Sequence, residues 1–279
     1  MIEEAVATPV ENKLKVFDDH HAPSAELLNP CVHCGFCLQT CPTYTLWGKE
    51  MDSPRGRIHL ISMAADGEIG LTDLYVSHFD HCLGCLACVT ACPSGIKYGK
   101  LIEAMRAQVA RQYQRPLRER LFRRMIAATF SQPKRLRKLA VALRAYQQLG
   151  LQRLARALHL TALLPQSLRT MEQLMPDLST KEASAPLPPR IAAQGEKRRT
   201  VAMVTGCVQS VFKAQVSAAT ARVLAAEGCE VLVPHEQGCC GALMLDLGQE
   251  KEALDLARKM IDTFEQTKVD AIVVNAAER

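Results

Sequence analysis

The chain has 279 residues, a formal net charge of +5 and 48% hydrophobic residues. This length suffices for two domains with buried cores, and no apolar run approaches the ~20 residues that a membrane-spanning helix needs. Twelve cysteines would indicate a disulfide scaffold in a short secreted chain, but the first thirty residues are acidic and predict no signal peptide. We therefore expect a cytoplasmic protein that begins with a polar leader, residues 1–26.

Eight of the cysteines follow this leader in two runs of identical spacing. Each run reads C-x2-C-x2-C-x3-C-P, with which bacterial ferredoxins bind [4Fe–4S] clusters. In such a run the fourth cysteine binds the other cluster. The first predicted cluster is therefore held by Cys31, Cys34, Cys37 and Cys92, and the second by Cys82, Cys85, Cys88 and Cys41. The alternatives are a zinc site, which usually shows two C-x2-C pairs, and disulfides.

Residues 27–105 are predicted to form a helical ferredoxin domain, because the segment between the two runs is too long for a minimal two-cluster repeat. Pro54 suits the first turn of a helix that follows it. Arg55 and Arg57 lie at its start, where they hold an anionic cluster, bind a partner's carboxylates or merely face solvent. Apolar residues beside the ligands, Phe36, Leu83 and Leu86, are expected to shelter the clusters from water.

Residues 106–176 are predicted to form basic amphipathic helices. Leucines recur at helical spacing, as at Leu117 and Leu121. Residues 106–169 contain fifteen Lys or Arg and the single acid Glu119, a charge of +14 that leaves −9 for the rest of the chain. Such a face fits an anionic membrane surface or an acidic partner subunit, unless it is only solvated. We expect no nucleic-acid binding, because no aromatic residues interleave the arginines.

Residues 177–199 resemble a linker, and residues 200–279 predict a second domain. Strands are expected at 200–205, 230–234 and 271–275, with helices at 209–227 and 242–267, the latter loosened at Gly248. This alternation predicts a parallel sheet. The fold class is therefore α + α/β: an α-helical two-cluster domain with a helical extension, then a βαβαβ domain.

A third group of cysteines follows the strands of this sheet. Cys207 comes after the first strand, and Cys239 and Cys240 come after the second. Both positions lie at the carboxyl edge of the sheet, where ligands bind, so the three thiols indicate a further metal or cluster site. The alternative is that they are small core residues. We expect Cys229 to be structural and His235 to be a loop residue.

The chain resembles the iron–sulfur subunits of bacterial glycolate oxidase. The resemblance rests on the first cysteine run, on Ser53 to Ile58, on Cys92 to Gly95, on Gly206 and Cys207, on Ala219 to Leu224 and on Gly238 to Gly241. It implies two [4Fe–4S] clusters followed by a cysteine-rich CCG domain like those of heterodisulfide reductase. It also implies partner subunits that carry FAD and oxidise glycolate, and often D-lactate, with electrons passing toward the respiratory chain at the inner face of the membrane.

Members of that family continue into a second CCG repeat, whereas this sequence ends shortly after Asn275. From this we expect a C-terminally truncated chain with an incomplete CCG domain and an incomplete third site. No flavin motif and no His–carboxylate pair is evident, so we assign no catalytic residue and place FAD only on the partners. Alternative functions are the iron–sulfur subunit of anaerobic glycerol-3-phosphate dehydrogenase, a related lactate-oxidising or heterodisulfide-reductase-like subunit, and a cluster-based sensor or scaffold.

Overall fold

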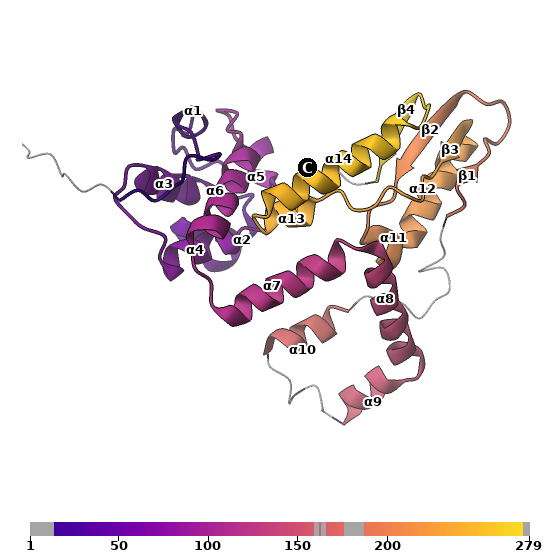
Figure 1. Ribbon diagram of the computed structural model, residues 1–279, viewed down its shortest axis with the longest axis horizontal. Coiled ribbons are helices and arrows are strands. Elements are labelled where there is room, and N and C mark those ends of the chain that lie inside the picture. The colour runs from indigo at the N-terminus through magenta and orange to yellow at the C-terminus, as the bar shows by residue number, and fades with distance from the viewer. Residues whose placement is uncertain (1–13, 159–161, 163–165, 176–186, 276–279) are drawn as a thin grey trace, which may run out of the picture. The chain divides into compact units, whose positions relative to one another are not determined.

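The computed structural model describes residues 14–158, 162, 166–175 and 187–275. The chain divides into two compact units, one of residues 1–119 with 244–250 and the other of residues 120–243 with 251–279 (Figure 1). The first half of the predicted leader, residues 177–186 of the predicted linker and the last four residues lie outside the described chain. None of the described helices is long and apolar enough to cross a bilayer.

The first unit is built from helices and loops. Its elements are α1 (Ala25–Leu28), α2 (Pro42–Trp47), the 3-10 helix η1 (Glu50–Asp52), α3 (Pro54–Ala65), α4 (Asp73–Asp80), α5 (Ala87–Thr90) and α6 (Tyr98–Gln112). Pro54 opens α3 as predicted, and Ser53 caps it by accepting a hydrogen bond from the backbone N–H of Gly56. The segment between the two cysteine runs is therefore helical, as the sequence predicts.

The core of this unit lies among α3, α4 and α6. Ile61 on α3, Phe79 on α4 and Leu101 on α6 are all at most 1% exposed and belong to one apolar cluster. Residues 14–26 are more than a leader, because Val16 is buried in this cluster. Asp18 accepts hydrogen bonds from side chains of α6, which fixes the segment to the helix.

The basic helices differ in how much of their apolar stripe is covered. They are α7 (Leu117–Phe130), α8 (Pro133–Gln148), α9 (Leu151–Ala157) and α10 (Gln166–Gln173). On α8, Leu136 and Ala140 are buried against Val211, which lies on the short helix α11 (Gln209–Phe212). On α7 and α9 the predicted stripes stay exposed, and Leu121, for example, is 67% exposed.

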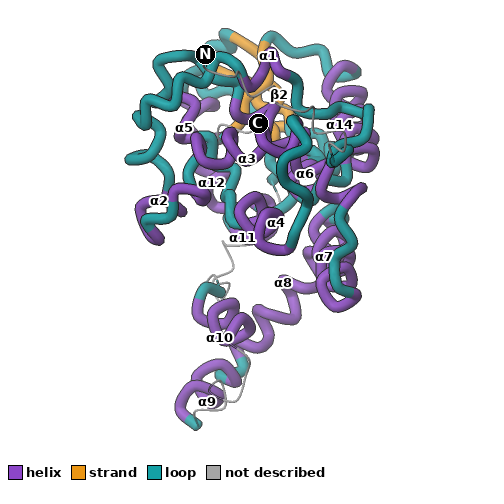
Figure 2. The backbone as a smooth tube through the Cα atoms, turned by 90° about the vertical axis from the view of Figure 1, so that its left-hand side faces the viewer, coloured by secondary structure: helices purple, strands orange, loops and turns teal. Residues whose placement is uncertain are grey.

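The second unit contains a four-stranded sheet, the orange strands in Figure 2. Its strands are β1 (Arg190–Ile191), β2 (Arg199–Val204), β3 (Cys229–Leu232) and β4 (Ala271–Val274), in the order β1-β3-β2-β4. Strands β2, β3 and β4 are parallel and match the three predicted strands. The fourth, β1, lies in the predicted linker and pairs antiparallel with β3, so the sheet is mixed rather than wholly parallel.

Helices cover both faces of this sheet. On one face Val201 and Met203 pack with residues of α12 (Ala214–Ala226). On the other, Ala202 and Val204 pack with Phe264 of α14 (Glu250–Glu265). Since both faces of β2 are buried, its sequence is a continuous apolar run. The predicted helix 242–267 is broken into α13 (Ala242–Asp246) and α14, and Gly248, with φ of +76°, lies between them.

Candidate iron–sulfur sites

The two cysteine runs fold into loops with the same backbone pattern. In each loop the middle cysteine, Cys34 or Cys85, is flanked by two residues of positive φ. These are His33 and Gly35 in the first loop and Gly84 and Leu86 in the second. Left-handed residues reverse the chain within a few residues, so three cysteines close together in sequence surround one space. The N–H of Gly84 lies 3.4 Å from Cys82 Sγ, as a sulfur-binding loop requires.

Each loop lines its own cavity, and the fourth cysteine of each cavity comes from the other run. The first cavity is lined by Cys31, Cys34, Cys37 and Cys92. The second is lined by Cys82, Cys85, Cys88 and Cys41. Pro54, Cys88 and Tyr98 line both, so the cavities share a wall. The structure thus brings together the same two sets of four thiols that the ferredoxin spacing predicts.

The sulfur positions do not fit a single metal ion. A tetrahedral zinc site with Zn–S bonds of about 2.3 Å requires its sulfurs to lie about 4 Å apart. In the described residues, two groups of three potential ligands come within 4.8 Å of one another, and neither contains a cysteine. Eight thiols spread around two cavities fit a larger inorganic group, and a [4Fe–4S] cubane takes four such thiolates.

A buried polar network lies beside the second cavity. Arg57, 1% exposed, lines the cavity, and its Nη1 is 4.0 Å from Cys41 Sγ. Its Nη2 lies 3.5 Å from the carboxylate of Asp52, which is also 1% exposed. The imidazoles of His78 and His81 lie within hydrogen-bond distance of the same carboxylate, at 3.0 and 3.1 Å. Arg57 therefore places a fixed positive charge beside Cys41, a predicted cluster ligand.

The same network acts on the thiol of Cys41. Burial raises the pKa of this thiol, but the hydrogen bond with Thr43 and the charge of Arg57 outweigh that effect and lower the pKa. By contrast, burial raises the pKa of Cys88 to about 12. A metal cluster binds thiolates, so the surroundings of Cys41 favour the form that a cluster would need, whereas those of Cys88 favour the protonated thiol.

Arg55 lies beside the first cavity, as predicted for a residue near a cluster. Its Nη1 donates to the backbone carbonyl of His33 at 2.9 Å, within the first cysteine loop. Its Nε donates to the carboxylate of Glu50 at 2.6 Å. A Cβ built on Gly35 would lie 2.8 Å from Arg55 Nη1, so this arginine is in close contact with the loop. Arg55 thus holds the loop while its charge is partly balanced by Glu50.

The expected shelter of the clusters by apolar neighbours is wrong for two of the three residues. Phe36 is 67% and Leu83 is 66% exposed, and only Leu86 packs against the core. Phe36 precedes Cys37 and Leu83 follows Cys82, and each lies two residues from a middle cysteine, Cys34 or Cys85, that is itself exposed. Each cavity therefore has one thiol at the surface.

The sequence reasoning missed Asp52, Thr43 and Tyr98. Thr43 accepts a hydrogen bond from Arg57 Nη2 at 3.2 Å and donates one to the backbone carbonyl of Asp52 at 2.7 Å. The hydroxyl of Tyr98 lies 3.7 Å from Cys82 Sγ. Only their closeness in sequence to the cysteine runs could have drawn attention to them: Thr43 follows Pro42, and Tyr98 lies shortly after the second run. Neither Thr nor Tyr is a typical cluster ligand.

In the second unit the structure brings Cys207 and Cys239 together. Their sulfurs lie 3.8 Å apart at the carboxyl ends of β2 and β3. This contact lowers the pKa of Cys207 and raises that of Cys239, and Cys240 contributes a further hydrogen bond to Cys239. Cys229 lies at the start of β3 and packs against the sheet core, as expected for a structural residue.

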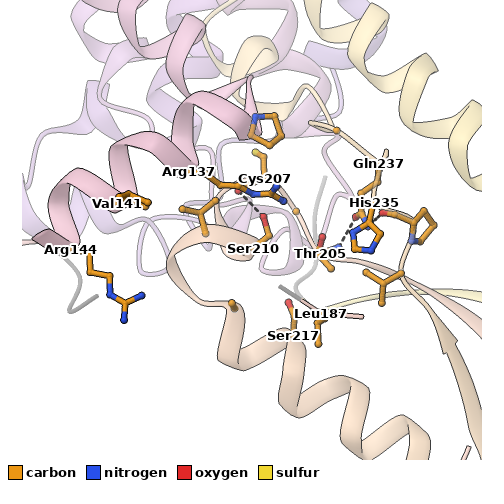
Figure 3. A pocket seen from close by; sticks show the side chains of 18 residues that line it. Arg137, Val141, Arg144, Leu187, Thr205, Cys207, Ser210, Ser217, His235 and Gln237 are labelled. Carbon is orange, nitrogen blue, oxygen red and sulfur yellow. Dashed lines mark hydrogen bonds between the residues drawn. The ribbon is translucent and has the colours of Figure 1, made fainter. Parts of the chain in front are cut away.

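Gln237, also missed from sequence, fixes the loop that carries this cysteine pair. Its Oε1 accepts a hydrogen bond from the N–H of Thr205 at 2.8 Å, and its Nε2 donates to the carbonyl of Pro234 at 2.7 Å. The side chain thereby ties the segment after β3 to the end of β2. His235 lies on the same loop and lines a cavity with Cys207 (Figure 3).

Three family models match successive parts of the chain. A 4Fe-4S dicluster domain matches residues 27–96, the linker region of the glycolate oxidase iron-sulfur subunit matches residues 118–175, and a cysteine-rich domain matches residues 201–278. No solved structure matches the chain.

Two curated relatives are similar along most of this chain. The probable glycolate oxidase iron-sulfur subunit of Bacillus subtilis is 38% identical over 253 residues, which are 90% of this chain and 57% of the relative. The glycolate oxidase iron-sulfur subunit of Escherichia coli is 37% identical over 238 residues, 85% of this chain and 52% of the relative. Lactate utilization protein A of an Exiguobacterium species is 38% identical over 73 residues, 26% of this chain and 30% of the relative. The chain thus spans about half the length of the first two.

Proposed function

We propose that the chain is the electron-transfer subunit of an FAD-linked glycolate oxidase, because it is similar to curated glycolate oxidase iron–sulfur subunits along most of its length. Its partners oxidise glycolate to the 2-oxo acid on FAD, and D-lactate is the second candidate substrate. The observation that carries this proposal is the pair of adjoining cavities, each lined by its predicted set of four cysteines drawn from both runs, with Cys88 also lining the first. The eight thiols fit two [4Fe–4S] clusters, which when bound supply one-electron carriers.

The residues of the first unit have distinct roles in this proposal. Cys31, Cys34, Cys37 and Cys92 hold one cluster, and Cys82, Cys85, Cys88 and Cys41 hold the other. Arg57 compensates negative charge at the second cavity, and Arg55 at the first. The shared wall keeps the two cavities adjacent, and the surface thiols Cys34 and Cys85 give each cavity an approach from solvent.

We also propose that residues 106–169 dock at the inner face of the cell membrane, in the cytoplasm. Exposed leucines such as Leu121 and Leu154 lie on helices whose other residues are rich in arginine. Apolar and basic residues on one helix fit a lipid surface that carries negative charge. Co-sedimentation with vesicles should require anionic lipid and weaken with salt. Absence of such binding would assign this surface to an acidic partner subunit.

The test of the main proposal uses the chain purified anaerobically with its bound partners. Addition of glycolate should bleach the visible absorption of the iron–sulfur clusters when FAD is present in the complex. D-lactate should act similarly if the partners accept it, and glycerol 3-phosphate should not. Bleaching by glycerol 3-phosphate alone would instead identify the chain as a subunit of anaerobic glycerol-3-phosphate dehydrogenase. If none of the three substrates bleaches clusters that are present at about eight irons per chain, the protein is a sensor or has another electron donor.

A further inference from the structure

A cavity of about 300 Å³ lies in the second unit, and its lining includes one predicted ligand of the third metal site, Cys207. It lies at the carboxyl edge of the sheet, between α8 and the segments that follow β2 and β3 (Figure 3). One wall is α8, which is held in place because Leu136 and Ala140 are buried against Val211. The opposite wall is formed by Thr205, Cys207 and Ser210, with His235 on the neighbouring loop.

The charges around this cavity favour an anion. Arg137 and Arg144 line it from α8, and His235 lines it from the loop after β3. Among the described residues that line it, none is acidic. Arg137 has no hydrogen-bond or ion-pair partner within the part of the chain that the structure describes. A guanidinium that lines a cavity without a carboxylate opposite it is suited to a carboxylate or phosphate of a ligand.

The remaining walls are mostly apolar. Val141, Leu187, Val211 and Val233 contribute aliphatic surface, and Ser210 and Ser217 contribute hydroxyl groups. An apolar cavity with a few convergent polar groups is the usual form of a small-molecule site. Its position at the carboxyl ends of parallel strands is where open α/β sheets bind ligands. Its volume is at the lower end of the range for such sites, which suits a ligand of one or two rings.

From these features we propose that the second unit binds a small organic anion in this cavity, with its carboxylate or phosphate at Arg137 and its apolar body against Val141 and Val233. The ligand lies beside Cys207, which lines the same cavity. This proposal is independent of the proposed electron donor, because it uses no residue of the first unit.

The probe for this site is 4-benzoylbenzoate, an aromatic carboxylate that forms covalent crosslinks under ultraviolet light. We expect the full chain to bind about one equivalent in calorimetry and to crosslink within residues 133–144 or 205–217. The neutral analogue 4-benzoylbenzamide should bind about tenfold more weakly or less, because it cannot make a charge-assisted bond with a guanidinium. Inorganic phosphate at high concentration should compete with the probe.

Three variants test the residues. Arg137→Gln should weaken binding of the carboxylate by about tenfold or more and leave the amide unaffected. Lys138→Gln is the matched control, because it removes the same charge from the next position of α8 without lining the cavity. Val141→Phe should block the probe by size, and because Val141 is 69% exposed this substitution leaves the core intact.

The proposal is overturned if the carboxylate and the amide bind equally, or if Arg137→Gln and Lys138→Gln weaken binding to the same extent. The first result would mean that the cavity takes any apolar molecule. The second would mean that the probe responds only to the general positive charge of the basic helices. Crosslinks confined to α7 or α9 would place the probe on their exposed leucines instead. None of these outcomes depends on glycolate oxidation, so the failure of this proposal is distinguishable from failure of the proposed function.

Discussion

The two units bring cysteines together in different ways. In the first unit three cysteines of each cavity lie within seven consecutive positions, and two left-handed residues fold them around one space. In the second unit Cys207 and Cys239 are 32 residues apart in sequence and meet because β2 and β3 are adjacent and parallel. The first arrangement is therefore a property of a short loop, whereas the second depends on the whole sheet.

The difference extends to the surroundings of the thiols. Beside the first unit's second cavity, Arg57 and Asp52 form a buried network that reaches Cys41. In the second unit the loop that carries Cys239 is held by Gln237, which is neutral and bonds to backbone atoms. A cluster in the first unit would thus have a buried positive charge beside its ligands, whereas the thiols of the second unit interact chiefly with one another.

The largest expected effect tests the crossed ligand sets. Cys41→Ala and Cys82→Ala should each remove one cluster of about four irons, and the double variant should lose no more than either single variant. Cys31→Ala combined with Cys41→Ala should lose about eight irons, because these cysteines line different cavities. Iron and sulfide analysis of the anaerobic protein measures both results.

The reverse result would show that each run holds its own cluster. In that case the variant lacking Cys31 and Cys41 would retain about four irons, and the variant lacking Cys41 and Cys82 would lose about eight. Cys229→Ala is the matched control for the loss of a thiol, since Cys229 packs against the sheet core of the second unit.

The second prediction concerns the three thiols of the sheet. We propose them as ligands of a third iron–sulfur site, so iron above about eight per chain should depend on Cys239. Cys239→Ser should remove this additional iron, and Cys229→Ser should not, although both alter a cysteine of the same unit. A content of about eight irons in the unaltered chain and in both variants would assign Cys207 and Cys239 another role.

The third prediction uses the two arginines beside the cavities. Arg57→Met leaves the carboxylate of Asp52 buried without its cation, which should lower the free energy of unfolding by about 3 kcal/mol. Arg55→Met should cost about 1 kcal/mol or less, because Arg55 and Glu50 are 29% and 40% exposed. The midpoint of urea unfolding under anaerobic conditions, followed by helical circular dichroism, measures both.

Equal midpoints for the two arginine variants would mean that the histidines at Asp52 compensate fully for the lost guanidinium. Arg57→Lys separates charge from geometry, since it keeps the cation and loses the planar fork that reaches His78, Thr43 and Asp52 together. The urea midpoint of Arg57→Lys should therefore lie between those of the unaltered chain and Arg57→Met.

The sequence was sufficient for the local parts of this architecture. The cysteine spacing predicts the two ligand sets, Pro54 predicts the start of α3, and the apolar runs predict β2, β3 and β4. Strand β1 could not be predicted, because two residues carry no periodic pattern and their pairing with β3 depends on the sheet. The role of Asp52 was hidden for a similar reason, since His78 and His81 reach it only after α4 packs beside η1.

The exposed leucines of α7 show a feature that the sequence pattern does not predict, namely whether the apolar face of a helix is buried. Leu117, Leu121 and Met125 repeat at helical spacing, which correctly predicts a helix, but periodicity does not say what covers the stripe. On α8 the same pattern is partly buried against α11, and on α7 it is not. Whether an apolar stripe belongs to the core or to a surface is therefore decided by the elements around it.

The smallest expected effect concerns Asp18, at the N-terminal segment. Its carboxylate accepts hydrogen bonds from Arg111 at 2.6 Å and from Gln108 at 2.8 Å, and chiefly the Arg111 bond holds the pKa of Asp18 well below its usual value. Asp18→Asn should therefore lower the free energy of unfolding by about 1 kcal/mol near neutral pH. Asp19→Asn is the control, because Asp19 is 92% exposed and pairs only with Lys15 at the surface.

The sign of the pH dependence follows from the lowered pKa. The carboxylate's contribution is fully present above the unfolded pKa of about 3.9 and is lost as the pH falls from there through the folded pKa. The difference in unfolding free energy between the unaltered chain and Asp18→Asn should thus be constant from about pH 5.5 to 8. This range lies well above the unfolded carboxyl pKa of about 3.9, so the carboxylate stays ionised throughout it. A difference that changes within this window would contradict the assignment of this contact to the Asp18 carboxylate.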